Sequence, residues 1–150
     1  MARVELKTFL DRTEKSVRQI LSQKTKMLAS VFIAETPTNI LIIATPWANE
    51  EQKQQYLPVL RQVFKKEGVT AYAMVSEAWV APQIVGDSRA PSDRDDRSEA
   101  IVILATDGID CIGRQFEIIR DDEGFISLGQ RDPKADDSDI REGRMTELLS

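Results

Sequence analysis

The sequence predicts an α+β domain, in which a single mixed sheet of about five strands carries a long N-terminal helix and one crossover helix. Three observations lead to this fold class. The chain has 150 residues, enough for one domain with a core of its own. It opens with an amphipathic stretch, and β-prone and helical patterns then alternate. Several short β-prone runs follow, so the expected order is α-β-β-α-β-β-β(-β).

The first expected element is a helix over residues 3–30. Its apolar residues recur at spacings of three, four and seven, which gives one stripe along a helix. The stripe consists of Leu6, Leu10, Val17, Ile20, Leu21, Met27 and Leu28. Thr13 and Lys24 interrupt it, so we expect the helix to lie on the surface of the domain and not in a free coiled coil.

A β-hairpin is expected to follow this helix. Residues 31–35 are β-prone, residues 36–39 have the composition of a turn, and residues 40–45 form a second β-prone run. The second run begins Ile-Leu-Ile-Ile-Ala and is apolar on both faces. This pattern is typical of a central strand that is covered on both sides.

A second helix is expected to begin at Asn49, whose side chain can cap it, and to end at Gly68. Pro58 lies in the middle of the helical pattern and predicts a kink or a division into two pieces. A strand, a helix and a strand in this order indicate a right-handed crossover. The strands at 40–45 and 69–80 are therefore expected to run parallel.

The remaining strands are expected to form an antiparallel meander. The β-prone runs cover residues 69–80, 100–106, 111–120 and 125–128. We therefore expect one domain over residues 1–128. A polar, acidic and mobile tail is expected over residues 129–150.

The composition excludes several kinds of site. The chain has no histidine and a single cysteine, Cys111. No Ser–His–Asp or Cys–His catalytic group can form without histidine, and one thiol forms neither an internal disulfide nor a zinc cluster. The first residues are too charged for a signal peptide, and no apolar stretch is long enough to span a bilayer. We therefore expect a cytoplasmic protein without a membrane partner.

Charge is distributed unevenly along the chain. Residues 1–30 hold seven basic and three acidic residues, whereas residues 117–150 hold five basic and ten acidic ones. The helix and the tail could each be solvated, or the basic helix could meet an acidic partner such as the tail of a second copy. The net charge of −5 and a pI near 4.9 argue against nucleic acid as a partner.

One segment, residues 76–99, has the features of a site. Glu77 lies within an otherwise apolar strand, on the same face as Val75 and Trp79. A carboxylate in that position must be paired or must reach the end of the strand. The connection over residues 81–97 is also much longer than a usual hairpin loop, and such loops tend to be functional or disordered.

Three interpretations of this segment are open. In the first, Arg94 or Arg97 folds back to neutralise Glu77, and the role is structural. In the second, carboxylates hold Mg²⁺ or Mn²⁺ for phosphodiester chemistry, although the segment has no lysine to stabilise developing charge. That metal cluster would consist of Glu77, Asp93, Asp95, Asp96 and Glu99. In the third, Trp79 and an arginine anchor a peptide or protein.

The same segment resembles a pattern in small uncharacterised bacterial and phage-encoded α/β proteins. The pattern is an SEAW-like strand end, here at 76–79, then a Pro-x-x-Arg-x-x-Arg-x-Glu turn, here at 91–99, and an apolar strand. The resemblance brings no established activity, and a phage or prophage setting would imply an accessory role in the host cytoplasm. It implies that one structural constellation contains Glu77, Trp79, Arg94, Arg97 and Glu99.

Two hypotheses about function follow. The first is a non-enzymatic accessory or protein-interaction module, which associates with itself or with a protein partner and needs no cofactor. The second is a hydrolase that acts on phosphodiesters or nucleotides through Mg²⁺ or Mn²⁺ held by the carboxylates of residues 77–99. The groups that face Glu77 in the structure distinguish between these hypotheses.

Overall fold

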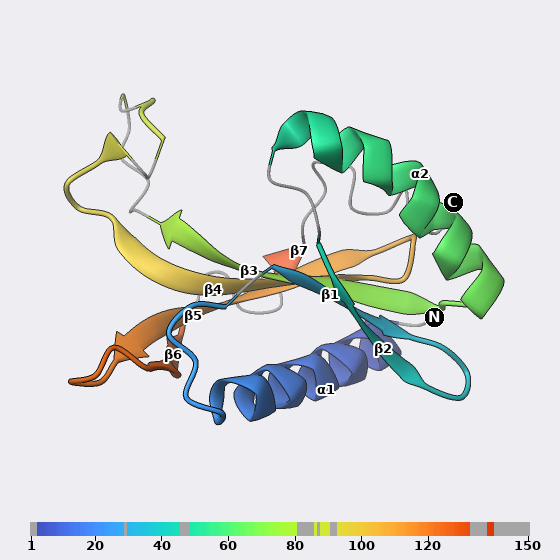
Figure 1. The fold of residues 1–150 in the computed structure, drawn as a ribbon, viewed down its shortest axis with the longest axis horizontal. Helices are drawn as coiled ribbons and strands as arrows, with labels where there is room; N and C mark the ends of the chain where they lie inside the picture. Colours follow the sequence, from blue (N-terminus) through green and yellow to red (C-terminus); the bar gives the residue numbers. More distant parts are fainter. Residues whose placement is uncertain are drawn as a thin grey trace.

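In the computed structural model, the described residues of the chain form one sheet and two helices, which confirms the α+β fold class (Figure 1). It describes residues 3–28, 30–45, 49–80, 86, 88–90, 93–132 and 138–139. The helices are α1 (Arg3–Leu21) and α2 (Glu50–Glu67). The strands are β1 (Val31–Glu35), β2 (Ile40–Ala44), β3 (Ala71–Val80), β4 (Ser98–Thr106), β5 (Cys111–Arg120), β6 (Ile126–Arg131) and β7 (Ser138–Asp139).

Every strand pair among the described residues is antiparallel. The strands lie in the order β2-β1-β3-β4-β5-β6, and β7 pairs with β5. β2 and β3 point in the same direction, as expected, because both are antiparallel to β1. However, β1 lies between them, so no parallel pair forms and the sheet is antiparallel rather than mixed. β1, the hairpin partner of β2, occupies the position beside β3 that β2 would need for a parallel pair.

The sheet separates two apolar cores, and each core is covered by one helix (Figure 1). α1 covers the larger core, which includes Leu10 of the helix and Ile101 of β4. α2 covers the smaller core on the opposite face, over β2, β1 and β3. There the ring centroids of Phe32, Phe64 and Tyr72 lie 5.1–6.2 Å apart. Alternate residues of β1 and β3 therefore serve different cores.

α1 ends at Leu21, so the expectation of a helix over residues 3–30 is wrong at its C-terminal end. Lys24 adopts a φ of 58°, in the left-handed region that stops a helix. The apolar residues beyond it keep the helical spacing without being helical. Leu28 reaches the larger core from the linker before β1, whereas Met27 is 74% exposed.

α2 has the caps that the sequence predicts. The side chain of Asn49 accepts a hydrogen bond of 2.9 Å from the backbone N–H of Gln52, and Gly68 ends the helix with a φ of 69°. Pro58 does not divide the helix, because it is exposed and water can solvate the carbonyl that its missing N–H leaves unbonded. Neither helix in the described part of the chain has the length and apolarity needed to cross a membrane.

β2 is an edge strand, and not the central strand that its composition predicts. Leu41 and Ile43 pack against the core under α2. Ile40 and Ile42 point to the other face, where 47% and 58% of their side chains are exposed. They stay exposed because α1 lies against β3, β4 and β6 and does not cover this edge of the sheet.

The sheet extends past residue 128, where the domain was expected to end. β6 runs to Arg131, and the short strand β7 pairs with Ile112 and Gly113 of β5. The expected boundary therefore falls inside β6. Most of the expected tail, residues 133–137 and 140–150, lies outside the described residues.

Candidate functional site

The ends of β3, β4 and β5 bring a set of charged and aromatic side chains to one end of the sheet. Glu77 and Trp79 belong to β3, Glu99 to β4 and Arg120 to β5. They share the α1 face, because alternate residues of these strands line the core under α1. Trp79 lies directly opposite Glu99 in the β3–β4 register, and Arg97 precedes β4. We call these five residues the strand-end cluster.

Glu99 and Arg120 form the charged centre of the cluster. Nε and one Nη of Arg120 donate to the two carboxylate oxygens of Glu99, each over 3.0 Å. These hydrogen bonds hold the pKa of the Glu99 carboxyl below its usual value. The same contact, together with the nearby charge of Glu77, raises the pKa of Arg120. The pair therefore stays charged around neutral pH.

Glu77 and Arg120 also hold the linker between α1 and β1. Oε1 of Glu77 accepts a hydrogen bond of 3.1 Å from the backbone N–H of Leu28. Arg120 donates to the carbonyl oxygen of Lys26 over 2.9 Å. The partner that Glu77 requires is therefore a backbone N–H, with Arg120 as the neighbouring cation, where the sequence pointed to Arg94 or Arg97.

Those two arginines have other partners. The guanidinium of Arg97 stacks on Trp79, with Cζ 4.5 Å from the ring centroid. Arg94 is buried and donates to Asp96 over 2.5 Å. The structure therefore brings Glu77, Trp79, Arg97 and Glu99 to one end of the sheet, and it pairs Arg94 within its own loop.

The carboxylates expected to bind a metal do not gather at one point in the described residues. Glu77, Asp96 and Glu99 each accept a hydrogen bond from an N–H donor, while Asp93 and Asp95 are exposed. No group of three potential metal ligands exists among the residues that the structure describes. Part of the loop before β4, at 81–85, 87 and 91–92, lies outside those residues.

Two arginines of β5 make contacts that the sequence analysis missed. Arg114 is buried and pairs with Asp11 at 2.6 Å and with Glu14 at 3.3 Å, both on α1. Arg120 holds the strand-end cluster. Both arginines lie on the face of β5 that is turned towards α1, and the other residues on this face are mostly apolar. An arginine among apolar residues on a buried face needs an acidic partner. This alternation in the sequence is the signal that could have identified Arg114 and Arg120.

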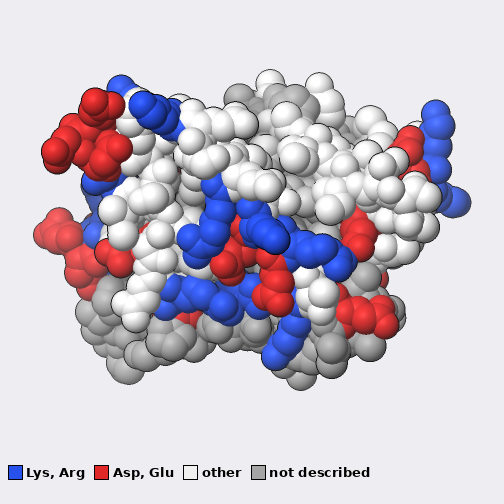
Figure 2. Space-filling view, turned by 90° about the horizontal axis from the view of Figure 1, so that it is seen from below, with Lys and Arg blue, Asp and Glu red and all other residues white. Residues whose placement is uncertain are grey.

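The α1 side of the molecule carries charges of both signs. Seen from this side, basic side chains lie across the middle, with acidic ones among and beside them (Figure 2). Several are paired, such as Arg12 with Glu35 and Arg18 with Glu14. A surface for nucleic acid is usually a broad basic patch, and the described part of this face has mixed charge instead.

A separate hollow of about 290 Å³ opens at the N-terminal end of α2. Its lining consists of Ser30, Thr45, Asn49, Glu50, Lys53, Met74 and Ser76. The side chain of Asn49 already accepts a hydrogen bond from the N–H of Gln52 at this helix terminus, and the negative charge of Glu50 would repel an anion bound there. The strand-end cluster is therefore the better candidate site.

No protein-family model, curated protein or solved structure matches the chain. The resemblance to bacterial and phage-encoded proteins stays a prediction.

Proposed function

We propose that the protein is a non-enzymatic accessory module, which binds another protein at the strand-end cluster and also associates with itself. The observation that carries the proposal is the exposed stack of Arg97 on Trp79. The Trp79 side chain is 45% exposed although it lies on a paired strand of the sheet. Tryptophan and arginine are the residues most enriched among binding hot spots.

The neighbouring contacts make Trp79 a preorganised anchor. At Trp79 the backbone of β3 is paired with β4, whereas β1 pairs with β3 further back, at residues 71–75, so β4 positions the strand under the ring. Glu99, opposite Trp79, is itself held by Arg120. A partner that covers the ring would therefore lose little conformational entropy from this side of the interface.

The chemistry of the cluster favours an acidic partner segment with an apolar residue. Arg97 covers Trp79, and in the neighbouring linker Lys24 and Lys26 lie 6.0 and 5.3 Å from the ring of Phe125. This end of the sheet thus presents cations beside aromatic rings at two places. An apolar side chain would pack on Trp79, and flanking carboxylates would meet the cations.

The alternative, a Mg²⁺- or Mn²⁺-dependent hydrolase, has no observation in its favour. A metal at Glu99 would have to displace the bidentate guanidinium of Arg120. The positive charge of that arginine would also repel the cation. We therefore place the metal-dependent hydrolase second.

Affinity capture with matched variants tests the proposal. Immobilised wild-type protein, Trp79→Ala and Ile109→Ala are exposed to lysate of the source cells, and bound proteins are quantified by mass spectrometry. Ile109 is 79% exposed in the turn after β4, so it controls for the loss of an exposed apolar side chain. We expect a protein that wild type and Ile109→Ala retain and that Trp79→Ala loses by at least about tenfold. The same captured proteins in equal amounts for all three, with Trp79→Ala folded by circular dichroism, would contradict the proposal.

A further inference from the structure

Among the strands that the structure describes, β2 is a free edge, and it has the composition of a buried strand. Its residues, Ile-Leu-Ile-Ile-Ala at 40–44, include no charge, proline or glycine. Natural edge strands are usually protected by lysine, proline or a bulge, because their unpaired backbone groups attract other strands. β2 has none of these devices, and its register with β1 is unbroken. Its composition is therefore that of a strand that is paired on both sides.

The hydrogen bonds of the hairpin show which backbone groups face outward. The N–H of Thr36 donates to the carbonyl of Asn39, and the N–H of Thr45 donates to the carbonyl of Ser30. Bonded and non-bonded pairs alternate along an antiparallel ladder. No described strand lies along the outer side of β2. The residues whose N–H and C=O groups point to that side are Ile40, Ile42 and Ala44.

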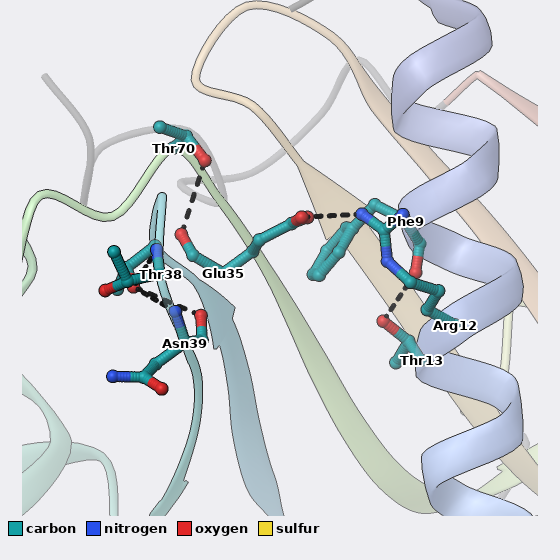
Figure 3. A network of polar contacts seen from close by, with 8 residues as sticks. Phe9, Arg12, Thr13, Glu35, Thr38, Asn39 and Thr70 are labelled. Carbon is teal, nitrogen blue, oxygen red and sulfur yellow. Dashed lines mark hydrogen bonds and ion pairs between the residues drawn. The ribbon is translucent and has the colours of Figure 1, made fainter.

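Polar contacts hold this hairpin in place (Figure 3). Within the turn, Oγ1 of Thr36 accepts a hydrogen bond of 2.9 Å from the N–H of Asn39. At the end of β1, Glu35 binds Arg12 of α1 at 2.6 Å, and its carbonyl accepts a hydrogen bond from Thr70 before β3. The hairpin is thus tied to both α1 and β3. A preformed edge of this kind lowers the entropic cost of adding a strand.

An apolar stripe on α2 lies beside the same edge. Tyr56, Val59 and Val63 follow spacings of three and four and are 40%, 52% and 37% exposed. Leu60 and Phe64 form the adjacent buried stripe. α2 runs opposite to β3 across the sheet (Figure 1). In a right-handed crossover, this placement turns the exposed stripe to the side of β2 and away from β4.

We infer that β2 pairs with β2 of a second copy, antiparallel, about a twofold axis at Ile42. This inference rests on the self-association in the proposed function and assigns it to a surface. In this register Ile42 faces Ile42 of the second copy, and Ile40 faces Ala44. The outward N–H and C=O groups of the two strands then satisfy each other, and two sheets become one.

The strand suits a second copy of itself. Its sequence is nearly symmetrical about Ile42, with Leu41 and Ile43 on either side, and it has no charge that needs an opposite charge. A twofold axis perpendicular to the sheet keeps both α2 helices on one face, so their exposed stripes approach each other across the new strand pair. A pair of five-residue strands alone buries too little surface for a specific dimer, and the contact between the two α2 stripes adds apolar area to the interface. The pairing occupies the β2 edge of both copies, so the assembly closes at two.

Sedimentation across a concentration series tests the dimer. We expect wild type to dimerise, and Ile42→Lys to raise the dissociation constant by at least about 100-fold, because two like charges would face each other at the axis. Ile42 is exposed in the single chain, so this lysine should leave the fold intact by circular dichroism. Ile109→Lys makes the same change at another exposed isoleucine and should dimerise as wild type does.

Cysteine cross-linking tests the register. Ile42→Cys should form a disulfide-linked dimer under mild oxidation, because facing α-carbons in a bonded antiparallel pair lie about 5.5 Å apart. Ile40→Cys should not cross-link alone, but it should cross-link when mixed with Ala44→Cys. The native thiol of Cys111 is buried and should not contribute.

Three outcomes would overturn the inference. They are a wild type that stays monomeric at about 0.5 mM, equal dissociation constants for Ile42→Lys and Ile109→Lys, and cross-linking of Ile40→Cys alone as fast as that of Ile42→Cys. Failure of the proposed function looks different, because capture through Trp79 does not involve β2. If wild type is monomeric but Trp79-dependent capture persists, the β2 inference and the proposed self-association fail, whereas the proposed binding of another protein at the strand-end cluster stands.

Discussion

The Glu99–Arg120 pair shows how much of the strand-end cluster depends on single charges. The two side chains are 37% and 36% exposed, so water screens their attraction. Their bidentate geometry nevertheless fixes both of them, and Arg120 then reaches the linker carbonyl of Lys26. The charge of Glu99 therefore supports its own ion pair with Arg120 and also the contact between β5 and the α1–β1 linker.

Glu99→Gln should lower stability near neutral pH and have no effect in acid. The folded-state pKa of Glu99 is lowered, so its contribution is present above the ordinary carboxyl pKa near 4.5 and is lost as pH falls through the lowered value. Arg120 stays charged throughout this range. Urea unfolding at several values between about pH 7 and pH 3 measures the difference between variant and wild type. Glu123→Gln, at an exposed turn residue, controls for the loss of one charge. A difference that stays constant down to pH 3 would contradict the assignment.

The need for a partner at Glu77 could be predicted from its apolar neighbours, but the identity of the partner could not. Arg94 and Arg97 are close in sequence, and this made them the natural candidates. The actual contacts come from Leu28, 49 residues away, and from Arg120 on a different strand. A sequence pattern records that a buried charge must be paired and does not record which distant element supplies the pair.

Among the elements, α1 is fixed to β5 by a buried charge. Arg114 is 4% exposed and lies under Asp11 and Glu14, which are one helical turn apart. A buried ion pair gains little over apolar packing, but a buried charge that has lost its partners is costly. The two ends of this contact should therefore respond differently to mutation.

Removing the acids should destabilise the protein more than removing the arginine. Asp11→Asn with Glu14→Gln leaves the buried guanidinium without these carboxylates and should cost about 3 kcal/mol of unfolding free energy. Arg114→Met substitutes an apolar side chain on an apolar face and should cost less than about 1.5 kcal/mol. Urea denaturation compares the two, and Lys53→Gln on the exposed face of α2 is the control for a weak surface pair with Glu50. The opposite order would show that the carboxylates are not what compensates Arg114.

Local features of the elements followed from the sequence, whereas their neighbours did not. Asn49 and Gly68 could be identified as caps, because each acts on backbone groups within a few residues. The end of α1 was missed because the spacing from Leu21 to Leu28 imitates a helix. The edge position of β2 depends on which strands pair, and an apolar run over Ile40–Ala44 suits a covered strand wherever it lies.

At the scale of the molecule, the described residues form one sheet between two unequal cores. The core under α1 includes residues of β1, β3, β4, β5 and β6, while the strands that contribute to the core under α2 are β2, β1 and β3. β3 serves both, since Ala73 and Val75 face α1 and Tyr72 and Met74 face α2. The loss of either core would remove the support of the other, so we expect the described fold to unfold cooperatively.

Cys111 provides a test of this cooperativity. It lies on β5, and burial raises the pKa of its thiol, so the folded protein should react slowly with a thiol reagent near neutral pH. Across a urea series, the onset of thiol labelling should coincide with the loss of far-UV circular dichroism. Labelling at urea concentrations that leave the dichroism native would mean that β5 opens on its own, and the sheet would then consist of separable halves. Coincident transitions would mean that the β1–β2 hairpin shares the stability of the larger core. In that case the free edge of β2 is as permanent as the rest of the fold, which a surface for a second copy requires.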